Sequence, residues 1–245
     1  MRIVKKILLF SFLLHVSFLN AQDTIVEYYN SDYKKVKKIK KASIIKKIVF
    51  DDNIWKVYEY SIDGKLRLTE NYTDKKLNDK TGKSIKFYGD GSIDYEIEFK
   101  NRLMHGTGKW YFKNGQLSSK KEFLEGKRTT LTFWNEKGEK IDSIDAEYPP
   151  TFNGGDIEAF YKWMEPRIIY PGIAKENGFK GEQVFRIYVD ENGKAGVDEI
   201  IKSVHYSIDD EIKKMIEESP QWKPGKKHGR FYKYTFDITL TYNLN

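Results

Sequence analysis

The chain has 245 residues, 39% hydrophobic and 32% charged, which allows one or two domains with their own cores and excludes a fully disordered chain. Its formal charge is +7, and removal of Arg2, Lys5 and Lys6 would leave +4, so charge alone does not indicate a nucleic-acid-binding protein. The sequence has no cysteine, which excludes disulfides, thiolate zinc sites, a cysteine nucleophile and a lipid-modified N-terminal cysteine.

The chain begins with an apolar run from Ile7 to Leu19 that follows three basic residues. As a helix these 13 residues would span about 20 Å, short of a hydrocarbon core of about 30 Å. Because the small residue Ala21 closes the run, we expect a signal peptide, residues 1–21, cleaved after Ala21. The alternative is a retained anchor, in which Ser11 and His15 would share one helix face and form a coupling pair.

Residues 22–53 are strongly basic, with eight lysines and no acidic residue between Lys34 and Lys47. One interpretation is a patch that binds an anionic surface. The other is a solvated lead-in arm before the first hairpin. We expect the solvated arm, because runs of like charge are usually exposed to water.

Residues 54–145 repeat one pattern, an apolar strand, a turn with Asp-Gly, Asn-Gly or Lys-Gly, and a second apolar strand. The turn glycines are spaced by 27, 24 and 23 residues, at Gly64, Gly91, Gly115 and Gly138. Asp-Gly and Asn-Gly are strong hairpin signals, because both residues of a tight turn tolerate positive φ. A fixed period of this length predicts small β-hairpin units that stack on one another.

These units resemble MORN-type repeats in a variant form found in bacterial antitoxin-like proteins. The resemblance rests on the positions Gly106, Trp110, Tyr111, Asn114 and Gly115. It implies an all-β array and says little about activity.

Residues 150–245 read as a compact α+β domain. A helix is expected from Asp156 to Pro166, and a second helix capped by Ser207 is expected to end at Pro220. Two strands flank the turn at Asn192-Gly193. The sequence therefore predicts an antiparallel sheet with two helices, preceded by the all-β repeat array.

The last strand alternates strictly between apolar and polar residues from Tyr232 to Leu244. We expect one face in the core and the other in water, and we expect a partner to bind at the edge of this strand. The candidate partner-binding residues are Lys233, Thr235, Asp237, Thr239 and Thr241.

The segments "YPGIAKENGFKGEQVFRIYVDENGKA" and "ESPQWKPGKKHGRFYKYTFDITLTYNL" resemble the C-terminal domain of TonB energy transducers, in the form found in Bacteroidetes. The resemblance implies a periplasmic domain that docks on outer-membrane transporters, with a receptor segment added as a strand to the sheet edge. The positions that carry the family motif, with structural roles, are Tyr170, Pro171, Gly181, Gly193, Trp222, Pro224 and Gly225.

The sequence departs from that family in its N-terminal half. TonB proteins have an uncleaved membrane helix and a long proline-rich spacer, whereas here no proline precedes Pro149. We expect the repeats to act as a rigid spacer instead, of roughly 40 Å for about eight strands.

The sequence offers no arrangement typical of an enzyme. His105, His205 and His228 have no metal-ligand spacing, and we expect them to be solvated. We therefore expect no catalytic residue, no metal site and no cofactor.

Three functions follow from these observations. The first is a non-enzymatic, periplasmic TonB-like protein that docks on an outer-membrane transporter or another envelope protein of a Gram-negative bacterium. The second is a secreted or surface-exposed structural module that binds proteins without energy transduction. The third is a true anchored energy transducer, if residues 5–22 are retained. We expect no nucleic-acid partner, at most a weak homodimer, and membrane contact only through partners unless the leading segment stays.

Overall fold

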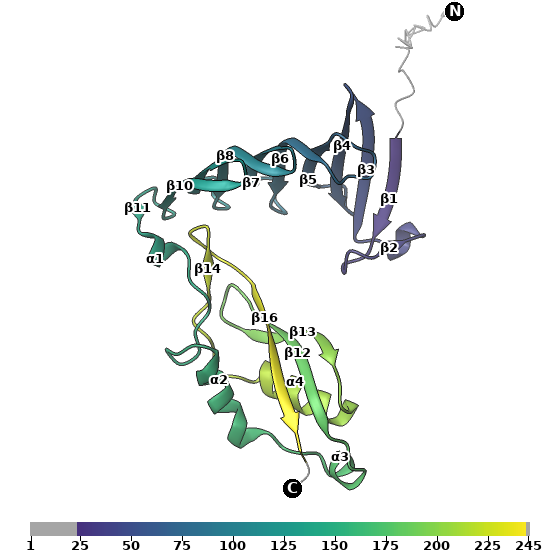
Figure 1. Ribbon diagram of the computed structural model, residues 1–245, viewed down its shortest axis with the longest axis vertical. Coiled ribbons are helices and arrows are strands. Elements are labelled where there is room, and N and C mark those ends of the chain that lie inside the picture. The colour runs from purple at the N-terminus through teal and green to yellow at the C-terminus, as the bar shows by residue number, and fades with distance from the viewer. Residues whose placement is uncertain (1–23, 244–245) are drawn as a thin grey trace, which may run out of the picture.

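A computed structural model describes residues 24–243, so the leading run, Ser11, His15 and the expected cleavage point lie outside the described residues. The described chain forms an eleven-stranded antiparallel sheet followed by a smaller α+β domain (Figure 1). Between residues 24 and 243, no helix is long and apolar enough to cross a membrane.

The large sheet, called the array here, comprises residues 24–141. Its strands pair with their chain neighbours, except that β1 lies between β3 and β2 at one end. The segment expected as a solvated lead-in arm therefore forms three strands of the sheet itself. The elements are β1 (Thr24–Tyr29), β2 (Lys35–Val36), the 3₁₀ helix η1 (Ile39–Lys41), β3 (Ile44–Asp51), β4 (Ile54–Ser61), β5 (Leu66–Tyr72), β6 (Lys80–Phe87), β7 (Ile93–Lys100), β8 (Leu103–Tyr111), β9 (Leu117–Leu124), β10 (Lys127–Trp134) and β11 (Lys140–Ile141).

The repeated turns share one backbone geometry. In the first, Ser61 N donates to Lys65 O at 2.9 Å, and Gly64 N donates to Ser61 O at 2.9 Å. The predicted hairpins are present at these glycines, and positive φ occurs at the glycine and not at the residue before it. These are three-residue loops closed by a left-handed glycine. The φ angles lie between 82° and 91° at Gly64, Gly91, Gly115 and Gly138.

The array has a small hydrophobic core. Its buried cluster consists of Ile48, Trp55, Val57 and Tyr72. The register places Lys46 opposite Glu59 beside the Ile48–Val57 pair, and the Lys46 Nζ lies 3.0 Å from the Glu59 Oε1. Ion pairs thus occupy positions on the array that a sandwich would fill with apolar side chains.

The smaller domain begins after β11. Its sheet has the order β13-β12-β16, and its buried core includes Phe160 and Met164 of α2 and Ile208, Ile212 and Ile216 of α4. The elements are α1 (Ser143–Ala146), α2 (Ile157–Met164), η2 (Glu165–Arg167), α3 (Gly172–Glu176), β12 (Gly181–Val189), β13 (Ala195–Lys202), α4 (Tyr206–Glu217), β14 (Lys226–Lys227), β15 (Arg230–Phe231) and β16 (Tyr234–Tyr242).

The two long helices begin with side-chain caps. The start at Asp156 is confirmed, because its carboxylate accepts a bond from Glu158 N at 3.0 Å. The cap expected at Ser207 is wrong. His205 takes that place, and its Nδ1 accepts from Ser207 N at 3.3 Å. The imidazole nitrogen satisfies the amide that a hydroxyl or carboxylate usually satisfies.

The family-motif residues hold the corners of this domain. Trp222 is buried, and its N donates to Gly193 O at 2.9 Å. A Cβ at Gly193 would lie 2.1 Å from the Trp222 carbonyl oxygen, so this close approach requires glycine. The Tyr170 ring meets the Tyr242 ring edge-on, with centroids 5.4 Å apart. The remaining motif positions lie before α3, at the start of β12 and ahead of β14, at Pro171, Gly181, Pro224 and Gly225.

Candidate partner-binding site

The strand β16 lies at an edge of the three-stranded sheet. It pairs with β12 over its whole length, from Tyr234 opposite Val189 to Tyr242 opposite Gly181. On the other side, Thr239 N donates to the hydroxyl of Tyr161, on α2, at 3.1 Å. Because backbone groups alternate sides along a strand, the N–H and C=O groups of alternate residues also point away from β12. We call the backbone groups of these residues the open edge: Thr235, Asp237, Thr239 and Thr241.

The candidate residues of β16 therefore all contribute backbone N–H and C=O groups to the open edge. Their side chains lie on the solvent face of the sheet and are exposed. There the Asp237 carboxylate accepts two bonds from Arg186, at 2.9 and 3.2 Å, and Arg186 Nη1 reaches Glu199 at 3.1 Å. This charged ladder runs across all three strands, so Asp237 is engaged within the sheet.

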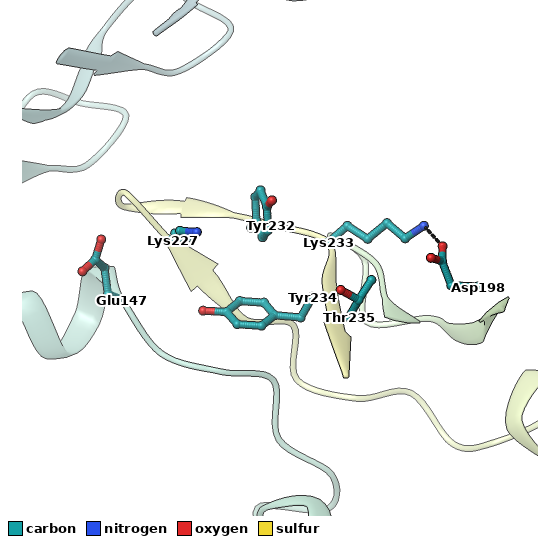
Figure 2. A pocket seen from close by; sticks show the side chains of 7 residues that line it. All are labelled: Glu147, Asp198, Lys227, Tyr232, Lys233, Tyr234 and Thr235. Carbon is teal, nitrogen blue, oxygen red and sulfur yellow. Dashed lines mark hydrogen bonds and ion pairs between the residues drawn. The ribbon is translucent and has the colours of Figure 1, made fainter. Parts of the chain in front are cut away.

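Lys233 lies outside β16, in the link between β15 and β16. Its Nζ is 2.9 Å from Asp198 Oδ1, and it lies 4.1 Å from the centroid of the Tyr188 ring. Figure 2 shows this pair at one side of a hollow of about 630 Å³, with Glu147 at the opposite side. The hollow is lined by both charged and aromatic side chains, and it adjoins the beginning of β16.

A second pocket, of about 360 Å³, lies beside the first half of the open edge. Its apolar wall is formed by Pro150, Ile157, Trp222 and Phe236, and its rim includes Thr235 and Asp237. An extended segment that paired with the open edge would pass this pocket, which could receive one apolar side chain.

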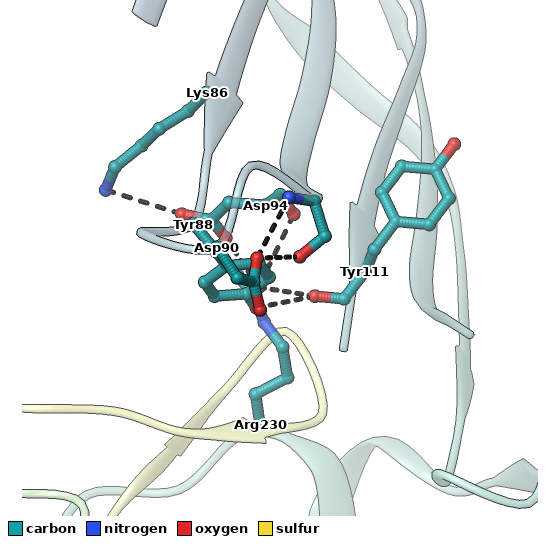
Figure 3. A network of polar contacts seen from close by, with 7 residues as sticks. Lys86, Tyr88, Asp90, Asp94, Tyr111 and Arg230 are labelled. Carbon is teal, nitrogen blue, oxygen red and sulfur yellow. Dashed lines mark hydrogen bonds and ion pairs between the residues drawn. The ribbon is translucent and has the colours of Figure 1, made fainter. Parts of the chain in front are cut away.

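The hairpin β14–β15 connects the smaller domain to the array. Its tip carries Arg230, whose Nη1 donates to Asp94 Oδ1 at 2.5 Å and to the Tyr111 carbonyl at 2.6 Å (Figure 3). The same nitrogen donates to the Tyr88 hydroxyl, which itself donates to Tyr111 O at 2.7 Å. The side chains of Arg230 and Asp94 are only 16% and 12% exposed. This ion pair is largely buried and joins residues 136 positions apart, and Asp94 Oδ2 also lies 3.4 Å from the Nζ of Lys86.

His228, on the same tip, is largely buried against the array and not solvated as expected. Its ring stacks on Trp110, with centroids 4.3 Å apart and planes 13° apart. Burial, together with the positive charges of Lys121 and Arg230, lowers the pKa of His228 to about 2. The ring is therefore neutral at physiological pH, although its Nδ1 lies 3.6 Å from Glu147 Oε1.

Glu147, just after α1, makes a further contact between the smaller domain and the array. Its Oε1 lies 2.8 Å from the Nζ of Lys121, a side chain that is 6% exposed and sits 5.1 Å from the Trp110 ring centroid. Burial lowers the pKa of Lys121. The carboxylate compensates a buried ammonium, as a buried charge requires. The hairpin tip therefore fixes the smaller domain against β7–β10.

Sequence reasoning missed this junction. The only local feature of the hairpin tip in the sequence is a glycine between basic residues, in "KKHGR", Lys226 to Arg230. This pattern is equally typical of an exposed turn. Between residues 24 and 243, no group of His, Cys, Asp or Glu is arranged to hold a metal ion.

Comparison with known proteins gave one family. No curated protein and no solved structure matches the chain. The matched segment, residues 166–244, contains the open edge and the hairpin tip but not α2, which carries Tyr161. These residues match the model of the Gram-negative bacterial TonB protein C-terminal, which supports a TonB-like C-terminal part that takes part in cell-envelope interactions.

Proposed function

We propose that this protein is a non-enzymatic, periplasmic TonB-like protein that docks on an outer-membrane transporter by strand addition to the open edge of β16. The observation that carries the proposal is the edge itself. β16 uses one side for β12, and among the described residues only the Tyr161 hydroxyl bonds an amide on the other side. A partner segment would pair with the outward backbone groups, each hydrogen bond contributing about 1 kcal/mol.

The array would serve as the spacer of this TonB-like protein. Its units are MORN-like in our proposal, and the buried hairpin tip supports a fixed orientation of the array relative to β16. Export and removal of residues 1–21 would place both parts in the periplasm, whereas retention would make the protein an anchored transducer.

A pair of substitutions at Thr241 tests strand addition. The Thr241 N–H points away from β12, so Thr241→Pro should keep the fold while removing one donor from the open edge. Thr241→Val keeps the donor and changes only the exposed side chain, which makes it the matched control.

The measurement is chemical cross-linking of the full chain to outer membranes through an introduced cysteine at Asn243, with the linked protein identified by mass spectrometry. The chain has no native cysteine, so the label is unique. We expect a transporter to be linked, and Thr241→Pro, but not Thr241→Val, to reduce the yield by about fivefold. Equal yields for the two variants, or no linked transporter, would contradict the proposal.

A further inference from the structure

The far end of the array carries an exposed basic loop. This loop, called the basic tip, comprises residues 33–42 and contains β2 and η1. All of its lysines are exposed: Lys34, Lys35, Lys37, Lys38, Lys40 and Lys41. The tip therefore concentrates positive charge at one end of a chain whose net charge is modest.

Most of this charge has no acidic partner. Lys35 pairs with Glu27. No ion pair within residues 24–243 involves the other five lysines, whereas Lys46, from the same lysine run, pairs with Glu59. Two lysines of the run, Lys35 and Lys46, are therefore paired, and the tip keeps five lysines without an ion pair among residues 24–243.

The tip also exposes apolar side chains among these lysines. Ile39, in η1, is 53% exposed, and Tyr33 is 49% exposed. Backbone bonds hold this shape: Lys41 N donates to Lys38 O at 2.9 Å, and Ser43 N donates to Tyr29 O at 2.7 Å. An aliphatic side chain is thus presented at the apex of an ordered basic loop.

We propose that the basic tip binds the surface of an anionic lipid bilayer. Lysines attract anionic headgroups, while an aliphatic or aromatic side chain inserts at the boundary of the acyl chains. Ile39 favours a bilayer over a soluble polyanion, because a polyanion in water offers no apolar region to bury it. This gives the protein a direct membrane contact in addition to contact through partners.

The basic tip and the contact with the smaller domain lie in different parts of the array. β2 is the outermost strand at one end of the array, and the hairpin tip of the smaller domain contacts β7–β10 toward the other end (Figure 1). From β2 to β7–β10 there are six to nine strand spacings of about 4.8 Å, which is roughly 29–43 Å along the sheet. A bilayer bound at the basic tip would hold the open edge of β16 away from that surface.

Sedimentation of the full chain with vesicles tests the proposal. One set contains phosphatidylglycerol and phosphatidylcholine, and the other contains phosphatidylcholine alone. The readout is the ratio of the two affinities, because the leading apolar run is common to every variant. In the test variant, Lys37, Lys38, Lys40 and Lys41 are each changed to glutamine. In the control, the same change is made at Lys175, Lys180, Lys213 and Lys214, which are exposed in the smaller domain.

We expect the tip variant to bind anionic vesicles at least about tenfold more weakly than the wild type. The control variant should keep most of the wild-type affinity. Ile39→Ser should weaken binding to anionic vesicles with no change in charge. Added salt should weaken binding of the wild type more than that of the tip variant. Equal losses in the tip variant and the control would overturn the proposal. A second outcome would also overturn the proposal: the wild type binds soluble heparin, and Ile39→Ser changes neither heparin binding nor vesicle binding.

Discussion

The array and the smaller domain are stabilised in different ways. The array has four residues in its buried cluster, and much of the rest of its sheet is held by strand pairing and ion pairs. The smaller domain has a buried cluster of fifteen residues around one three-stranded sheet. A structure with one core unfolds as a unit, whereas stacked units unfold from their ends. The stability of the array therefore depends on what covers its end strands, and the hairpin tip protects the part near one of those ends.

The largest expected effect comes from opening the core of the smaller domain. Phe160 is fully buried and contacts Phe152 and Trp222. Phe160→Ala should lower the free energy of unfolding by about 3–5 kcal/mol. Hydrogen exchange should then rise throughout β12, β13 and β16. In contrast, Trp55→Ala should raise exchange only in β3–β5 and their neighbours. Exchange that spread equally in both variants would contradict the difference between the regions.

The next effect concerns the junction. Arg230→Met leaves the Asp94 carboxylate with only the half-exposed Lys86 ammonium, at 3.4 Å, as its ion-pair partner, which should cost about 1.5–3 kcal/mol in urea unfolding. The matched control is Arg186→Met, which breaks the ion pairs with Asp237 and Glu199 on the solvent face of the sheet. All three side chains are well exposed, at 39%, 46% and 59%, so the loss should cost less than about 1 kcal/mol. Similar costs for the two variants would show that the junction contributes little.

His228 makes the junction sensitive to pH. Its folded-state pKa lies below the unfolded value of 6.5, so the unfolded chain binds a proton first as the pH falls. Stability is therefore unaffected above about pH 6.5 and decreases below it, by up to about 1.4 kcal/mol per pH unit. His228→Phe keeps a ring that can stack on Trp110 and should remove this contribution. Urea unfolding at several pH values would detect the change in slope, and an unchanged slope would refute it.

The smallest effect concerns Tyr161. Tyr161→Phe removes the hydroxyl that accepts from Thr239 N, at a cost of about 0.5–1.5 kcal/mol in stability. The freed amide should strengthen binding of a partner strand by severalfold. The measurement is titration with a synthetic peptide from the transporter segment found by cross-linking. Weaker peptide binding by the variant would mean that Tyr161 supports the partner and does not compete with it.

Local signals in the sequence predicted much of the fold. The turn glycines marked the hairpins, and the alternation after Tyr232 marked the last strand, because both reflect neighbours along the chain. The cap at His205 was missed because an imidazole at this position gives no reliable signal. Residues 24–51 were missed as strands of the array because their lysines resemble a solvated segment, although Lys46 has its acidic partner on β4.

The candidate site was only partly predictable. The residues of β16 were identified from alternation, but the outward direction of their backbone follows from the register with β12 and the contact to Tyr161. The junction could not be predicted, because Arg230 meets Asp94 across 136 residues. The partners of a buried charge depend on the three-dimensional arrangement, and nothing near Arg230 in the chain identifies Asp94.

The hairpin tip also determines how the molecule would carry force. Only Tyr232 and Lys233 separate β15 from β16, so tension applied along β16 reaches Arg230 almost directly. There it would load several hydrogen bonds, an ion pair and a ring stack at once, and the segment at Pro149 and Pro150 would be largely bypassed. A flexible linker would stretch before it transmitted a pull. This junction would transmit the pull to the array as a stiff coupling, and it would be the first place to shear when the load became too large.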